Sequence, residues 1–160
     1  MRILFVCLGN ICRSPTAEAV MRSLVTEAGL ADEIEVESAG TGNWHAGEPP
    51  DPRATETAAE RGVELVGSAR QIDAADFENF DLLIAMDRAN HAELLRMAPN
   101  ADARDRVGLL REFDPEAPDA DPAPGVPDPY FGGGDGFAEV IEIVDRCCAS
   151  LLDSIRAGRT

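Results

Sequence analysis

Short apolar runs alternate along the chain with stretches of helical periodicity. The run at residues 2–6, RILFV, is continuous, as is typical of a strand buried on both faces of a parallel sheet. Residues 15–28 then carry apolar side chains at three- and four-residue spacing, which predicts a helix. Ser14 is a favoured N-cap, Pro15 suits the first helical position, and Gly29 suits a left-handed C-cap. The chain is therefore expected to begin with a strand, a loop and a helix.

The same alternation continues to the end of the chain. A final helix is expected over residues 137–155, which have the clearest apolar stripe. Four strands joined by helices imply right-handed crossovers, and so an α/β fold: a single-domain three-layer sandwich with a four-stranded parallel sheet flanked by helices. The remaining strands are predicted at residues 34–40, 81–86 and 106–110, and the remaining helices at residues 52–62 and 87–98.

Residues 113–135 interrupt this pattern, because they are too rich in proline, glycine and aspartate for a helix or a central strand. A loop of this length in a small domain is usually either disordered or functional. The segment PDPYFGG contains the aromatic pair Tyr130 and Phe131, which favours a functional second half.

Length and composition narrow the classes of protein. The 160 residues fit one domain, 1–160, that can bury a core without metal or disulfide support. No apolar run suits a membrane span or a signal peptide, so a cytoplasmic protein with reduced thiols is expected. With 14 basic and 30 acidic residues, the net charge of −16 argues against binding to nucleic acid or to an anionic membrane.

The stretch VCLGNICRSP at residues 6–15 carries the candidate chemistry. Cys7 ends the first predicted strand, and the loop after it leads to a helix N-terminus, where open α/β sheets bind ligands. Inward-pointing backbone N–H groups and the helix dipole favour a bound phosphate there. Gly9 and Asn10 tolerate the positive φ that such a loop requires, and Arg13 offers a planar two-pronged donor.

The same positive field acts on the thiol, because cysteines at helix N-termini beside arginine ionise readily. Cys7 is therefore a candidate nucleophile, and the hydroxyl group of Ser14 can donate to its sulfur. Taken singly, these residues would be a buried cysteine and a helix cap, but the C-x5-R-S spacing favours an oxyanion-binding thiolate. A metal site is disfavoured, because Cys147 and Cys148 are adjacent and the two histidines lie in unrelated segments.

Attack on a phosphomonoester also requires a proton donor for the departing oxygen, and the loop contains no histidine. Asp128 is the best candidate, because prolines flank it and nearby aromatic residues would help it keep a proton. The alternative is a solvated turn aspartate, as is expected for Asp119 and Asp121. Residue context alone leaves both interpretations of Asp128 open.

Four segments, FVCLGNICRSPTAEAV, ESAGTGNWHAGEPPDPRA, AMDRAN and PDPYFGG, resemble the low-molecular-weight protein tyrosine phosphatases in order and spacing. The resemblance covers nearly the whole chain. It implies a phosphatase-I-like fold and hydrolysis of phosphotyrosine or small aryl phosphates through a phosphocysteine on Cys7. Arg13 would then bind the phosphate and Asp128 would act as general acid and base. No cofactor and no metal are implied.

The resemblance also implies supporting residues around the loop. Cys12 occupies a position from which oxidation can bridge it to Cys7, forming a reversible redox pair; the alternative is a buried loop thiol. Trp44 and Phe131 would either wall the substrate crevice or pack inside the protein. The supporting set comprises Asn10, Ser14 and Ser38 as hydrogen-bonding residues, Asp87 to orient Arg13, Leu8, Trp44, Tyr130 and Phe131 as walls, and Gly9, Ile11 and Cys12 within the loop.

Related functions are distinguished by single residues. Thioredoxin-linked arsenate reductases use mid-chain cysteines, and this chain has none between Arg13 and Arg146; protein arginine phosphatases carry threonine where Ile11 stands. An idle phosphate-binding module would need neither Cys7 nor Asp128. The expected substrate is a phosphotyrosine-containing protein, such as a tyrosine kinase or its target. Inorganic phosphate or other oxyanions would compete, and a monomer or weak dimer is expected.

Overall fold

A four-stranded parallel sheet forms the centre of the protein in the computed structural model, which describes residues 1–117, 119–130, 132 and 134–160. The strands follow the order β2-β1-β3-β4, so that β1 lies between β2 and β3. The sequence prediction of an α/β fold with a four-stranded parallel sheet is confirmed. The strands are β1 (Arg2–Cys7), β2 (Glu35–Gly40), β3 (Leu82–Ala85) and β4 (Val107–Leu109).

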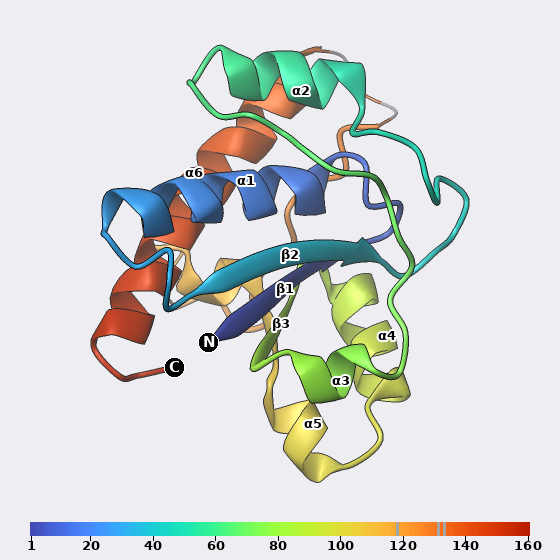
Figure 1. Ribbon diagram of the computed structural model, residues 1–160, viewed down its shortest axis with the longest axis vertical. Coiled ribbons are helices and arrows are strands. Elements are labelled where there is room, and N and C mark those ends of the chain that lie inside the picture. Colours follow the sequence, from blue (N-terminus) through green and yellow to red (C-terminus); the bar gives the residue numbers. More distant parts are fainter. Residues whose placement is uncertain (118, 131, 133) are drawn as a thin grey trace.

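Helices cover both faces of this sheet (Figure 1). On one face lie α1 (Arg13–Glu27), α2 (Pro52–Ala59) and α6 (Gly134–Arg156), and on the other lie α3 (Asp76–Asn79), α4 (Arg88–Met97) and α5 (Ala101–Asp105). A 3-10 turn, η1 (Leu110–Phe113), follows β4. The sequence did not predict α3, α5 or η1, because elements of four or five residues are too short to show helical periodicity.

The core consists of two apolar layers that the sheet separates. In β1, Ile3 and Phe5 belong to the layer shared with α1 and α6, whereas Leu4 and Val6 belong to the layer shared with α3 and α4. All four side chains are fully buried. Alternate side chains of a strand point to opposite faces, so burial on both faces explains the continuous apolar run.

The start of α1 differs from the sequence prediction. The helix begins at Arg13, with Cys12 as an N-cap that makes no side-chain capping bond, so Ser14 is not the N-cap and Pro15 is not the first helical residue. The hydroxyl group of Ser14 is used elsewhere, beside the sulfur of Cys7 at 3.0 Å. Gly29 has φ of 73° just after the helix, as predicted. Within the described residues, no helix has the length and apolar character needed to cross a membrane.

Candidate active site

The loop between β1 and α1 forms the floor of a cavity of about 210 Å³ at the carboxyl end of the central strand. Nine side chains and one glycine line it, and they come from three segments of the chain that the fold brings together. They are Cys7, Leu8, Gly9, Ile11, Cys12, Arg13, Trp44, His45, Asp128 and Tyr130. The topology places this cavity at the edge of the sheet where α/β proteins bind ligands.

Two loop residues have distinct conformational roles. Asn10 has φ of 56°, a left-handed conformation that asparagine tolerates, and its backbone N–H donates to the Cys7 sulfur at 3.3 Å. Gly9 does not have a positive φ, which corrects the sequence prediction. A Cβ atom at position 9 would instead lie 3.1 Å from Cδ2 of His45, so close packing against that ring favours glycine.

The sulfur of Cys7 lies at the end of a hydrogen-bond chain. The side-chain amide of Asn10 donates to Oγ of Ser14 at 2.8 Å and to Oγ of Ser38 at 3.0 Å. Since Ser14 accepts that bond, its own proton is available to the Cys7 sulfur, with the carbonyl of Ala39 as a more distant acceptor at 3.4 Å. A hydroxyl group and a backbone N–H thus both contact this one sulfur, where they can stabilise negative charge that develops on it.

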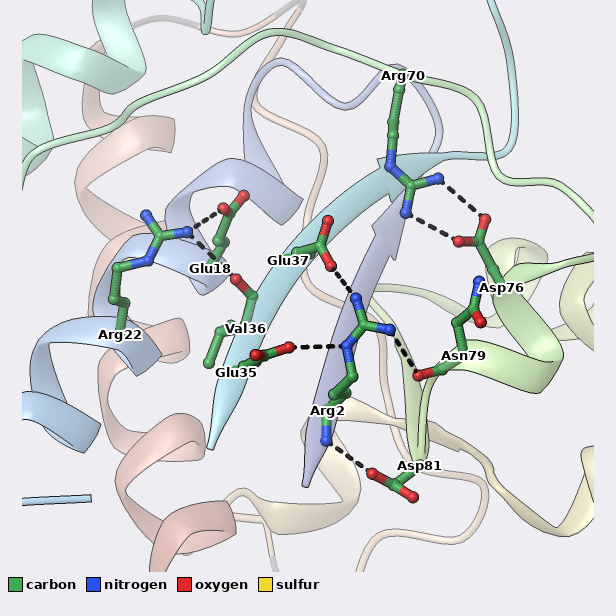
Figure 2. A network of polar contacts seen from close by, with 10 residues as sticks. All are labelled: Arg2, Glu18, Arg22, Glu35, Val36, Glu37, Arg70, Asp76, Asn79 and Asp81. Atoms are coloured by element: carbon green, nitrogen blue, oxygen red, sulfur yellow. Dashed lines mark hydrogen bonds and ion pairs between the residues drawn. The ribbon is translucent and has the colours of Figure 1, made fainter. Parts of the chain in front are cut away.

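Two arginine–carboxylate pairs hold the residues of this hydrogen-bond chain in place. The hydroxyl group of Ser38 donates to Glu18 on α1. The second carboxylate oxygen of Glu18 accepts from Arg22 on the same helix (Figure 2). The backbone N–H of Arg70 donates to Oδ1 of Asn10 at 3.0 Å, while Asp76 holds the Arg70 guanidinium with two bonds (Figure 2). The amide of Asn10 therefore has partners on both its oxygen and its nitrogen, which fixes its orientation.

Arg13 is almost fully buried at the edge of the cavity. Its Nη1 donates to Oδ2 of Asp87 at 2.6 Å and to the carbonyl of Val126 at 3.1 Å. Burial alone lowers the pKa of Arg13, but the charges of Cys7, Asp87 and Asp128 outweigh this and raise that pKa above its usual value. The guanidinium therefore stays charged and held in one orientation, as a phosphate clamp requires.

Asp128 lies over the same cavity, although it is 115 positions downstream of Arg13 in a proline-rich loop. Its Oδ2 is 3.5 Å from Nη2 of Arg13, and its Oδ1 accepts from the backbone N–H of Tyr130 at 3.1 Å. The loop is fixed nearby, because the N–H of Val126 donates to the carbonyl of Met86 at 2.7 Å. The fold thus brings together the thiol, the guanidinium and a carboxyl group that the sequence separates.

The two loop cysteines differ in their surroundings. Burial, and then the negative charges of Asp51, Cys7 and Asp128, raise the pKa of Cys12 to about 12. Cys12 therefore stays a neutral thiol beside Cys7, and both cysteines are free. A thiol without a field that favours ionisation is a poor nucleophile, so the structure supports different chemistry for the two sulfurs.

The cavity walls settle one sequence alternative. Trp44 is 71% exposed, so it lies at the mouth of the cavity and is not packed in the interior. Leu8 and Tyr130 are also exposed there, as expected for walls. Phe131, the remaining predicted wall residue, lies outside the described residues.

Sequence reasoning missed His45 and Arg53. His45 lines the cavity, its Nδ1 lies 2.6 Å from Oε2 of Glu48, and its ring centroid is 5.8 Å from that of Tyr130. Arg53 contacts Asp51 and the carbonyl of Tyr130. Neither residue stands in a spacing that suggests chemistry, so only the fold reveals them. Across the described segments, no group of three or more His, Cys, Asp or Glu side chains could hold a metal ion.

Comparisons with known proteins agree with this geometry. The family model described as low molecular weight phosphotyrosine protein phosphatase matches residues 2–160. A low molecular weight protein-tyrosine-phosphatase from Streptomyces coelicolor is 46% identical over 155 residues, covering 97% of this chain and 93% of its own. These matches extend well beyond the loop between β1 and α1.

Solved structures show the same fold. A protein tyrosine phosphatase from Entamoeba histolytica, crystallised with Hepes in its active site, has a TM-score of 0.94 at 37% identity, over 100% of this chain and 99% of its own. A drosophila arginine phosphatase also matches, with a TM-score of 0.88 at 32% identity over 98% of both chains. The fold alone therefore does not separate the two substrate classes.

Proposed function

The chain belongs to the low molecular weight phosphotyrosine protein phosphatase family of hydrolases, and on this premise we propose that it hydrolyses phosphotyrosine and small aryl phosphates through a phosphocysteine on Cys7. One observation carries the proposal: the Cys7 sulfur, the Arg13 guanidinium and the Asp128 carboxyl group line one cavity. We treat residues 1–160 as one domain that performs this reaction.

In the first half of the reaction, the Cys7 thiolate attacks phosphorus in line with the departing aryl oxygen. A sulfur–phosphorus bond forms and the phosphorus–oxygen bond breaks, while Asp128 gives its proton to the leaving phenolic oxygen. Arg13 and the N–H groups of the loop neutralise the charge on the remaining phosphate oxygens. Ser14 stabilises the sulfur anion before attack and after release.

In the second half, water attacks the phosphocysteine. Asp128, now ionised, accepts a proton from this water, and the sulfur–phosphorus bond breaks to give inorganic phosphate and the Cys7 thiolate. Asp128 therefore ends the cycle protonated, ready for the next substrate. Because phosphate and other oxyanions fit the same loop, they compete with substrate; a related phosphatase holds Hepes, a sulfonate, in its active site.

The cavity supports an aryl phosphate over a phosphoarginine. Ile11 lines the floor and Leu8, Trp44 and Tyr130 line the walls, so the space above the phosphate site is largely apolar. A guanidinium group loses hydration there without gaining hydrogen-bond partners from Ile11, whereas a phenyl ring gains contacts.

The substrate is a phosphotyrosine side chain of a protein, including that of a tyrosine kinase or its target. The protein acts in the cytoplasm as a monomer or weak dimer.

Cys12 completes the proposal as a redox partner. A peroxide would oxidise the Cys7 thiolate to a sulfenic acid and be reduced to water. The Cys12 thiol would then attack the Cys7 sulfur and displace water to form a disulfide, which a dithiol reduces back to two thiols. Cys12 lines the same cavity as Cys7 and is not needed for hydrolysis in this scheme.

The test is release of phenol from aryl phosphates at neutral pH. Wild-type protein should turn over p-nitrophenyl phosphate, and Cys7→Ser should abolish turnover, because an uncharged hydroxyl replaces the thiolate. Asp128→Asn should lower kcat by about a hundredfold or more and flatten one limb of the pH profile. Full activity in Cys7→Ser would reject the nucleophile, and a near-normal rate in Asp128→Asn would reject the acid.

A further inference from the structure

Residues 8–12, between β1 and α1, are called the anion-binding loop below. Arg53 is the second residue of α2 and lies between this loop and the segment that carries Asp128. We propose that Arg53 is a positioning residue that holds residues 128–130, and with them the Asp128 carboxyl group, over the cavity. The proposal rests on the function of Asp128 proposed above. It gives a role to an arginine that does not line the cavity.

The backbone and the guanidinium of Arg53 are both anchored to the anion-binding loop through Asp51. The nearly buried carboxylate of Asp51 accepts from the backbone N–H of Arg53 at 2.8 Å, from Nε at 3.1 Å and from Nη2 at 2.9 Å. The hydrogen bonds from Arg53 hold the pKa of Asp51 below its usual value. The backbone N–H of Asp51 in turn donates to the carbonyl of Ile11 at 2.8 Å. The guanidinium is therefore fixed relative to the floor of the cavity.

The same guanidinium also contacts residues 128–130, the acid segment. Nη2 of Arg53 donates to the carbonyl of Tyr130 at 3.1 Å. The backbone N–H of Tyr130 donates to Oδ1 of Asp128. The guanidinium carbon lies 5.7 Å from the ring centroid of Tyr130 and 4.7 Å from that of Phe137 in α6. A continuous series of contacts thus runs from Ile11 through Asp51, Arg53 and Tyr130 to Asp128.

The guanidinium group suits this position better than other cations. Its planar array of donors can hold a carboxylate with two bonds and still donate to a carbonyl, while its face packs on an aromatic ring. Lysine retains the charge but cannot keep all of these contacts at once. Methionine puts a flexible apolar thioether where the guanidinium packs on Phe137 and loses every side-chain donor, so it removes the tether and can still pack on that ring.

The test compares two substrates that depend differently on the acid. Phenyl phosphate has a poor leaving group that needs protonation, whereas p-nitrophenyl phosphate releases a stable anion. Arg53→Met should lower kcat/KM for phenyl phosphate about tenfold more than kcat/KM for p-nitrophenyl phosphate, because a misplaced acid delivers its proton poorly. The inhibition constant of inorganic phosphate should change by less than about twofold, because the anion-binding loop keeps its own contacts.

Arg61→Met is the matched control. Arg61 follows α2 and forms an exposed ion pair with Glu142 of α6 at 3.0 Å, so its loss removes an arginine contact without touching the acid segment. This variant should leave the ratio between the two substrates unchanged. Arg53→Lys should give an intermediate ratio, and it provides the same comparison if Arg53→Met folds poorly.

The outcomes separate the two proposals. Equal losses on both substrates, or no loss, in Arg53→Met and Arg53→Lys would overturn the positioning role, provided that Asp128→Asn still discriminates against phenyl phosphate. If Asp128→Asn shows no such discrimination, the assignment of the acid fails, and the positioning role fails with it. A large rise in the phosphate inhibition constant of Arg53→Met would assign Arg53 to the anion-binding loop instead.

Discussion

At the scale of single residues, the site depends on charged side chains that pair with one another and thereby keep their orientation. The carboxylate of Asp87 has two tasks: it accepts from Nη1 of Arg13, and it caps α4 by accepting from the backbone N–H of Asn90 at 2.7 Å. A substitution at this position therefore mixes phosphate binding with helix stability. Two different substitutions can separate the tasks.

Asp87→Asn keeps a good N-cap but removes the charge beside Arg13. We expect the inhibition constant of inorganic phosphate to rise about tenfold, because the guanidinium loses a charge-assisted bond that fixes its orientation. Asp87→Ala should show the same loss and, in addition, a fall of about 1 kcal/mol in the free energy of unfolding. Phosphate competition and urea unfolding measure the two effects. Unchanged phosphate inhibition in both variants would show that Asp87 only caps the helix.

The sequence predicted which residues gather at the cavity better than it predicted their arrangement there. The C-x5-R-S spacing identified Cys7 and Arg13, because a strand, a short loop and a helix place them at one edge of a sheet. It could not predict that the carboxyl group of Asp128 lies 3.5 Å from Arg13, since that distance depends on long-range contacts of a loop without periodicity. For the same reason, the positions of His45 and Arg53 at the site could not be predicted from the sequence.

At the scale of elements, a buried aspartate ties α6 and η1 to the loop that leads to the acid. Asp114 accepts from Arg146 of α6, from Arg111 of η1 and from the backbone N–H of Glu116, and Arg111 also donates to the carbonyl of Gly125 at 3.0 Å. Burial raises the pKa of Asp114, but these hydrogen bonds outweigh burial and lower that pKa below its usual value. The proline-rich segment is thus anchored near Val126.

A depressed folded-state pKa contributes stability that is present above the unfolded value and lost as pH falls through the folded value. Asp114→Asn should therefore cost about 3 kcal/mol of unfolding free energy near neutral pH, because a buried amide matches the donors of two part-buried arginines poorly. The difference from wild type should shrink as pH falls below about 4, where the carboxyl group of the unfolded chain takes up its proton, and should be lost as pH falls through the lower folded-state pKa. Urea unfolding at a series of pH values measures both.

Asp102→Asn is the control for Asp114→Asn, since Asp102 is exposed and its contact with Arg106 is 3.6 Å long. Its effect on unfolding free energy should stay below about 0.5 kcal/mol at every pH. A stability difference for Asp114→Asn that is independent of pH would contradict the ionised state assigned to Asp114.

The strands and helices were predicted correctly where the apolar pattern extends over most of the element. The parallel strands and the helices α1, α2, α4 and α6 were predicted within a few residues, because their apolar patterns match burial on one or both faces. The start of α1 was wrong at Ser14, because the choice of cap was decided by the tertiary bond between its hydroxyl group and Cys7. Local propensity cannot include such a contact.

At the scale of the whole molecule, the net charge of −16 opposes a dianionic substrate. Screening limits this repulsion to charges within about 8 Å at physiological ionic strength, whereas in the proposed mechanism Arg13 and the loop N–H groups contact the phosphate directly. Raising NaCl from about 0.05 to 0.3 M should therefore increase kcat/KM for p-nitrophenyl phosphate by less than about threefold. A steep decrease with salt would show that long-range attraction, and not the local site, drives binding.

The central claim is that Cys7 becomes covalently phosphorylated during turnover. Rapid acid quenching of the protein with p-nitrophenyl phosphate, followed by mass spectrometry of its peptides, tests this claim directly. We expect one phosphoryl group on Cys7, none on Cys12, a longer-lived adduct in Asp128→Asn, and no adduct in Cys7→Ser. Turnover without an adduct on Cys7, or with the phosphoryl group on another residue, would contradict it.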